Sequence, residues 1–205
     1  MQVKYGCHTI ILYGSRARGE PNNTSDYDII AIREKGDFLR DCKMYDNFYL
    51  DAFIYSEEAI KNPDISLVRI KDGVVILQKE SIGDILLKEI KNIFDKGSPK
   101  TAAWEKHEII TWTQKMLQRA KVNDIEGNFR LHWLLHDLLE CYFKMRDNWY
   151  LGPKESFRWL KANDPAAHAA FETALKSNAC FSDVEKLIYH VTEIEKNENV
   201  VNEKT

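Results

Sequence analysis

The stretch ILYGSRARGEPNNTSDYDIIAI, residues 11–32, decides the fold of the first part of the chain. It begins with an apolar run, turns in a segment of glycine, serine and arginine, and ends in a second apolar run that opens with Asp26 and Asp28. Residues two apart on a strand point to the same side, so both carboxylates are expected on one face. Their charges repel, and the repulsion grows as water is excluded. The pair therefore predicts a cation-binding site at the start of this strand.

A third acid, Asp51, lies inside another apolar and aromatic run, FYLDAFIY (48–55). An unpaired carboxylate within such a strand would be costly. If the two strands are neighbours, the three acids form one cluster. Magnesium binds carboxylate oxygens and keeps waters or substrate phosphates, and three carboxylates suit a two-metal site for in-line displacement at phosphorus. The alternative is that Asp51 pairs with an arginine such as Arg33 or Arg69.

The turn between the two apolar runs has the composition of a phosphate site. Gly14 and Ser15 end the first run and are expected to open a helix, whose backbone N–H groups and positive end favour phosphate. The Ser15 hydroxyl adds a donor, and Arg16 and Arg18 add positive charge. Gly19 allows close backbone approach. A phosphate cradle and a metal cluster are thus predicted within one short stretch.

These residues resemble a known family. The segment GSRARGEPNNTSDYDI is similar to the signature of the DNA polymerase β-like nucleotidyltransferase superfamily, which is G-S, about a dozen residues, then D-x-D, with a third carboxylate on a following strand. The resemblance covers roughly residues 8–80 and is strongest to small bacterial minimal and antibiotic nucleotidyltransferases, which are often joined to or paired with a helical domain. Members usually carry a helix before the first strand, whereas only about seven residues precede it here. Either the sheet edge is covered differently, or the helical domain or a second chain covers it, which leaves a homodimer open.

The resemblance implies a metal-dependent enzyme that transfers a nucleoside monophosphate, AMP from ATP or the equivalent from another NTP, to a hydroxyl of a small molecule and releases pyrophosphate. The implied site has two Mg²⁺ ions on Asp26, Asp28 and Asp51, and the triphosphate on Gly14, Ser15 and Arg16 or Arg18. Two alternatives stay open. One is an antitoxin-type AMP transferase that acts on a protein partner, and the other is a nucleotide-binding regulator without chemistry.

The pattern of the chain predicts a small mixed-sheet α/β (α+β) domain over 1–97, an all-α bundle over 98–195 and a flexible tail over 196–205. Strands are expected at 8–14, 27–33, 48–55 and 73–78, and helices near 36–44, 56–63 and 81–97. After KGSPK (96–100) helices are expected at 101–121, 124–147, 153–162, from Asp164-Pro165 onward, and at 183–195 behind a capping box of Ser182 and Glu185.

The segment 124–147 carries a polar stripe, His132, His136 and Glu140, on one face of a mainly apolar helix. The functional interpretation is a cleft in which Glu140 or a histidine deprotonates the acceptor hydroxyl. Zinc binding is a second interpretation, and internal hydrogen bonds or partial exposure a third. The arginine and H-x-Y motif of HEPN ribonucleases, which partner minimal nucleotidyltransferases, is incomplete here. Arg130 and His136 have its spacing, but Leu138 stands in place of tyrosine.

The next segment, 145–165, is dense in aromatic residues that either stack on a sugar or base or belong to the core. They are Trp149, Tyr150, Phe157 and Trp159.

Composition narrows the partners. The net charge is −3, with 14 basic and 16 acidic residues in 1–97 and 15 and 16 in 98–205. A nucleic-acid-binding protein usually shows a basic stripe, so nucleic acid is not expected as a partner. No run is long and apolar enough to span a bilayer. Four scattered cysteines without a C-x-x-C pair suit reduced thiols, and the expected location is the cytoplasm.

Overall fold

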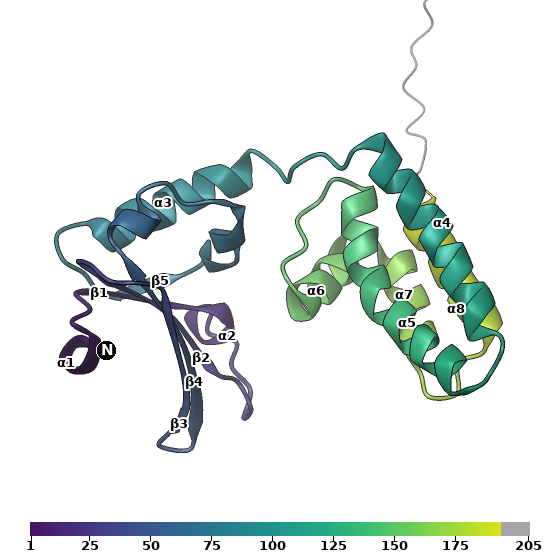
Figure 1. Ribbon diagram of the computed structural model, residues 1–205, viewed down its shortest axis with the longest axis horizontal. Helices are drawn as coiled ribbons and strands as arrows, with labels where there is room; N and C mark the ends of the chain where they lie inside the picture. Colours follow the sequence, from purple (N-terminus) through teal and green to yellow (C-terminus); the bar gives the residue numbers. More distant parts are fainter. Residues whose placement is uncertain (194–205) are drawn as a thin grey trace, which may run out of the picture. The chain divides into compact units, whose positions relative to one another are not determined.

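A computed structural model describes residues 1–193 of the chain (Figure 1). The chain divides between Gly97 and Ser98 into two compact units, and each is considered by itself. The tail predicted over 196–205 lies outside the described residues.

The first unit is built around a five-stranded mixed sheet with the strand order β3-β4-β2-β1-β5. The strands are β1 (Thr9–Tyr13), β2 (Tyr27–Arg33), β3 (Leu39–Tyr45), β4 (Phe48–Ser56) and β5 (Val74–Leu77). β2 and β4 run parallel, and the other neighbours are antiparallel. With the all-helical second unit, this confirms the predicted fold class of a small mixed sheet with helices followed by a helical bundle.

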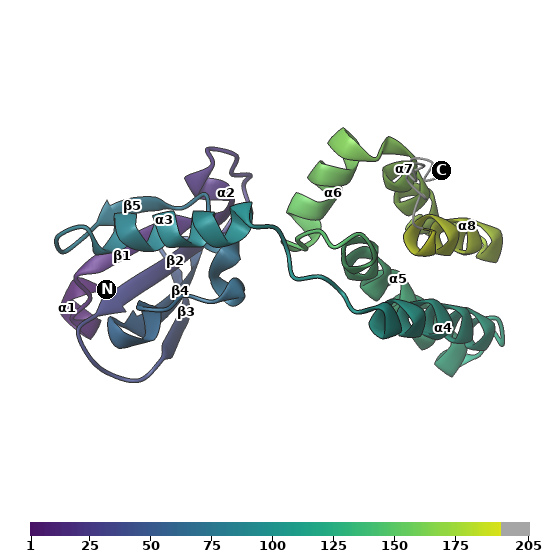
Figure 2. The same cartoon turned by 90° about the horizontal axis from the view of Figure 1, so that it is seen from above.

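One face of the sheet is covered by α3 (Ile82–Asp95), which lies across the strands in both views (Figures 1 and 2). Along β2, Asp28, Ile30 and Ile32 alternate with the residues between them and share this face. Ile30 and Ile32 are fully buried in one cluster with Leu86 and Ile90 of α3. Asp28, at the start of β2, therefore points to the same side of the sheet as the buried core residues Ile30 and Ile32. The opposite face receives the short helix α1 (Gln2–Tyr5), which supplies the small element that precedes the first strand.

Two predicted helices of this unit are wrong. Residues 36–44 form most of edge strand β3, which returns into β4 through a tight turn in which Asp46 and Asn47 have φ values of 47° and 67°. An edge strand buries little, so β3 lacks the apolar alternation that marks a strand. Residues 56–63 contain only a 3₁₀ turn, η1 (Glu58–Ile60), and a second one, η2 (Ile65–Ile70), follows. Helix α3 is confirmed.

The second unit consists of α4 (Ala103–Ala120), α5 (Ile125–Met145), α6 (Pro153–Asn163), α7 (Pro165–Ala174) and α8 (Phe181–Thr192). The Asp164 carboxylate caps α7 by accepting from the Ala167 N–H at 3.0 Å, as predicted. The prediction of Ser182 as the N-cap of α8 is wrong. The Asp183 carboxylate accepts from the Cys180 N–H at 3.0 Å, so the helix begins ahead of Ser182.

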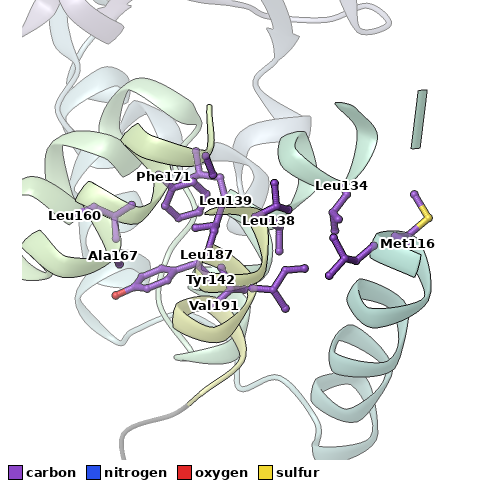
Figure 3. Packing of buried hydrophobic residues seen from close by; sticks show 14 of the residues in the cluster. Met116, Leu134, Leu138, Leu139, Tyr142, Leu160, Ala167, Phe171, Leu187 and Val191 are labelled. Atoms are coloured by element: carbon purple, nitrogen blue, oxygen red, sulfur yellow. The ribbon is translucent and has the colours of Figure 1, made fainter. Parts of the chain in front are cut away.

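Helix α5 supplies the centre of this bundle. Its side chains Leu134, Leu138 and Tyr142 are buried and point into a cluster with Phe171 of α7 and Leu187 of α8 (Figure 3). Within residues 1–193, no helix combines the length and apolarity needed to cross a membrane. The four cysteines are all unpaired thiols.

Candidate functional site

The parallel pairing of β2 and β4 places Asp28 directly opposite Asp51. On the other side of β2, antiparallel β1 places Tyr13 opposite Asp28. Asp26 lies two residues before Asp28, just ahead of β2, and is exposed. The two acid-bearing strands are therefore neighbours. The three carboxylates lie toward the same end of these strands, which we call the acid edge.

Asp28 is the central acid of the three. It is half-buried, and its pKa is raised above the ordinary value first by burial and then by the charges of Asp26 and Asp51. Arg69 and Arg18 act in the opposite direction without cancelling the rise. A carboxylate held among like charges is stabilised in its ionised form by a cation.

Gly14 shows why the turn after β1 begins with glycine. Its φ is +73°, and a Cβ there would lie 2.3 Å from the Asp28 Oδ2 atom. The turn therefore packs directly against the central acid. The helix that follows, α2 (Gly14–Ala17), opens at Gly14 as predicted but has only four residues, and the role of its N-terminus toward phosphate stays a prediction. A helix this short has little macrodipole, so most of the positive charge that would attract a phosphate must come from side chains.

Asp51 is already paired, and its partner is an arginine that the sequence did not single out. Arg40 of β3 donates from Nε and Nη2 to the two carboxylate oxygens, both at 2.8 Å, and the Cys42 Sγ lies 3.0 Å from Oδ1. The bond to Arg40 is the main cause of a lowered pKa of Asp51. Arg33 donates instead to the Asp37 carbonyl. Arg40 was missed because its strand was expected to be a helix.

These contacts decide how well the acids suit Mg²⁺. Among residues 1–193, no three histidine, cysteine, aspartate or glutamate side chains are arranged as a ready ligand group. The engagement of Asp51 with Arg40 is a physical reason for this. Asp26 and Asp28 remain as oxygen ligands of the kind Mg²⁺ prefers, and a cation would relieve the repulsion that raises the Asp28 pKa. The acid pair therefore fits the ion, and Asp51 could join it by exchanging Arg40.

The Arg16 guanidinium faces backbone carbonyls. Its Nε donates to the Ser25 and Asp26 carbonyls at 3.0 and 3.2 Å, and its Nη2 donates to the Ser25 carbonyl at 2.7 Å. The group also stacks over the rings of Tyr27 and Phe48, 4.1 and 4.9 Å from their centroids. These contacts tie the turn after β1 to the start of β2.

Ser15 and Arg18 complete the predicted phosphate set. Ser15 follows Gly14 in the turn, and its carbonyl accepts from the Glu20 N–H at 2.9 Å. The Arg18 Nε lies 3.5 Å from a Glu20 carboxylate oxygen. Both side chains are half-buried beside the acid edge, and their role toward phosphate stays a prediction.

In the helical unit, the polar stripe of α5 faces outward. His132 and His136 are exposed, and the His136 Nδ1 lies 2.7 Å from Asp137. Glu140 is paired with Lys144 at 2.8 Å, one turn along the helix. The stripe therefore lies on the solvent side of a helix whose other side makes the core, and the role of Glu140 toward an acceptor hydroxyl stays a prediction.

The remaining candidates of this unit make contacts within the unit itself. Arg130 forms an ion pair with Glu126, and Leu138 is fully buried where the ribonuclease motif has tyrosine. Of the aromatic candidates, Tyr150 in the loop after α5 and Phe157 of α6 pack against the core cluster. Trp159 packs edge-on against the buried Phe143 ring at 5.4 Å.

Comparison with known proteins finds a likeness in structure alone. No family model and no curated protein matches the chain. Among the solved structures that match is the crystal structure of a nucleotidyltransferase-like protein from Exiguobacterium sibiricum 255-15, with 14% sequence identity and a TM-score of 0.41. The match covers 91% of this chain but 66% of that one. A likeness at this level carries no argument about activity, which depends on the site itself.

Proposed function

We propose that the chain is a metal-dependent nucleotidyltransferase that transfers a nucleoside monophosphate, AMP from ATP in the first instance, to a hydroxyl of a small molecule and releases pyrophosphate. The observation that supports this most is the register of β2 and β4, which sets Asp28 opposite Asp51 with Asp26 just ahead. The turn at Gly14 packs against the same acid.

The residues divide the work by their chemistry. Asp26 and Asp28 would hold Mg²⁺, and Asp51 would complete a two-ion site after releasing Arg40. When bound, the ions supply neutralising charge to the α-phosphate and the leaving pyrophosphate. The backbone of Gly14, the Ser15 hydroxyl and the Arg18 guanidinium would bind the β- and γ-phosphates, because they are hydrogen-bond donors at the same edge.

Glu140 is our candidate for the general base. Its carboxylate could accept the proton of the acceptor hydroxyl once Lys144 moves aside, and such a role typically contributes 10²–10⁴-fold. The test is turnover of Glu140→Gln with Glu126→Gln as the control, since Glu126 also pairs with a basic residue on α5. Equal turnover in both variants would remove Glu140 from the mechanism.

The experiment that tests the function starts with thermal unfolding in each of the four NTPs, with and without Mg²⁺. A ligand at a hundredfold over its Kd adds about 2.7 kcal/mol to the free energy of unfolding. A Mg²⁺-dependent shift with one nucleotide names the donor. Pyrophosphate release is then measured with a panel of hydroxyl acceptors, and Asp26→Asn should abolish it while the circular dichroism spectrum is unchanged. Near-normal turnover in that variant would sink the mechanism.

The regulator without chemistry is the second candidate, and the Arg40–Asp51 pair favours it. An acid held by an internal arginine leaves a site that can bind a nucleotide without assembling both ions. This candidate predicts the same thermal shift with no pyrophosphate release for any acceptor.

An antitoxin-type transferase is the third candidate. Exposed apolar side chains on α5, Ile125, Phe129 and Trp133, are the feature that favours a protein partner. Transfer of labelled AMP to a protein rather than to a small acceptor would distinguish it.

A further inference from the structure

We propose that Arg16 is a positioning residue that fixes the Asp26 backbone, and not a ligand of the triphosphate. This inference rests on the proposed function, because it assigns Asp26 to the metal. It concerns how one acid of the site is held in place.

The need for an anchor follows from where Asp26 lies. The ladder between β2 and its neighbours begins at Tyr27 and Asp28, so strand pairing does not hold the residue before them. The preceding segment, 19–24, is exposed. It is held by local bonds, such as Ser25 N–H to the Asn22 carbonyl at 3.1 Å. Without a further contact, the proposed metal ligand Asp26 would stand at the end of an exposed loop that few contacts hold.

Arg16 supplies that contact with a geometry only a guanidinium has. Its Nε bridges the Ser25 and Asp26 carbonyls, and Nη2 adds a second bond to Ser25. The planar fork fixes both the position and the direction of the peptide that carries Asp26. A lysine at this position keeps the charge and loses the fork.

The other side of the guanidinium is held by two rings. Tyr27 opens β2 and Phe48 opens β4, and their rings meet edge to face with centroids 5.5 Å apart. Arg16 stacks on both, so it joins the turn after β1 to the starts of the two acid-bearing strands. A side chain engaged in this way holds the backbone of the site in place. Of the two arginines predicted to bind phosphate, Arg18 is then the candidate.

The test compares Arg16→Lys and Arg16→Gln with Arg18→Gln. Binding of Mn²⁺ alone is measured by electron paramagnetic resonance, and binding of ATP is measured separately with EDTA present. Loss of a residue that orients a metal ligand typically costs 10–100-fold in metal affinity. Both Arg16 variants should lose Mn²⁺ affinity to about this extent and keep metal-free ATP affinity, whereas Arg18→Gln should show the reverse.

A second readout does not depend on metal. Subtilisin should cleave within residues 19–25 faster in both Arg16 variants than in the wild type, while the thermal unfolding midpoint identifies any global loss of folding. If Arg16→Gln does not fold, Tyr27→Leu removes one stacking partner and should show a smaller change of the same kind.

The outcomes separate this inference from the function. Arg16→Lys with wild-type Mn²⁺ affinity and wild-type cleavage would overturn the positioning role. Arg16→Gln with the ATP defect of Arg18→Gln would return Arg16 to the phosphates. Equal Mn²⁺ binding by the wild type and Asp26→Asn would instead overturn the metal site, whatever Arg16 does.

Discussion

Asp28 and Asp51 stand opposite each other on parallel strands, yet their pKa values are displaced in opposite directions. Burial and two like charges raise the pKa of Asp28, whereas the bond to Arg40 lowers the pKa of Asp51. The protein thus keeps one acid at an energetic cost and satisfies its neighbour. A costly carboxylate beside a satisfied one marks the place where a cation would act most strongly.

Asp28→Asn should stabilise the metal-free protein while abolishing turnover. Because the folded pKa lies above the ordinary value of 3.8, the folded state binds the extra proton and the wild type loses stability as the pH rises through the folded pKa. The amide removes this penalty. Thermal unfolding at pH 7 should show a higher midpoint for the first unit of the variant, about 4–8 °C for each kcal/mol in a unit of this size. The difference from the wild type should narrow toward pH 4. A lower midpoint at pH 7 would contradict it.

Asp51→Asn should change stability in the opposite sense. The folded pKa of Asp51 is lowered, so its contribution is full above the ordinary value of 3.8 and is lost as the pH falls through the folded pKa. The Arg40 side chain is 53% exposed, so solvent screening keeps the loss at pH 7 to about 1 kcal/mol or less. Urea unfolding at pH 7 measures it, and a more stable variant would be the contrary result.

Arg40→Gln should raise the affinity for Mg²⁺ in the absence of nucleotide. The ion no longer competes with an internal cation for Asp51, and the gain should stay within roughly fivefold because the pair is partly exposed. Calorimetric titration with Mg²⁺ measures it. Lys43→Gln is the control, because Lys43 on the same strand pairs with Asp41 at 3.1 Å and not with the acid cluster. Equal affinity in the two variants would mean that Arg40 does not compete.

Gly14→Ala and Gly19→Ala form a matched pair, with φ values of +73° and +72°. The backbone cost of the left-handed conformation, about 1–2 kcal/mol, applies to both. At Gly19 the new methyl group meets nothing within 4 Å, but at Gly14 it meets the Asp28 carboxylate. Only Gly14→Ala should therefore also lose Mn²⁺ binding, measured as above. Binding lost equally in both variants would assign the effect to the turn as a whole.

Asp164→Ala should destabilise the helical unit more than Asp124→Ala. Each removes a helix cap worth about 1 kcal/mol. Asp164 also accepts from the buried Tyr142 hydroxyl at 2.6 Å, and loss of that acceptor adds about 1–3 kcal/mol. The Asp124 carboxylate accepts the capping bond from the Gly127 N–H at 2.7 Å and has no buried hydroxyl donor like Tyr142 among the described residues. Urea unfolding compares the two, and similar losses would show that the Tyr142 bond contributes nothing net.

The sequence predicted the elements whose signals are local and strong. Apolar runs with β-branched residues predicted β1, β2 and β4, and apolar residues at helical spacing predicted α3 and α5. Burial of one face imposes both patterns on the sequence. Edge strand β3 has no such face, so neither the strand nor Arg40 could be found. The strand neighbours of Asp28 depend on contacts far apart in the chain. The capping of α8 was missed because Cys180 is not a usual capping residue.

The contact between Gly14 and Asp28 has a thermodynamic consequence. The backbone that would bind the triphosphate and the carboxylate that would bind the ion touch each other, so a change in one is felt by the other. Two ligands that share such a contact have a coupling free energy, and it is reciprocal. The factor by which bound Mg²⁺ raises the affinity for ATP must equal the factor by which bound ATP raises the affinity for Mg²⁺. A cycle of four binding constants would give that factor, and Gly14 is where its structural origin would be sought.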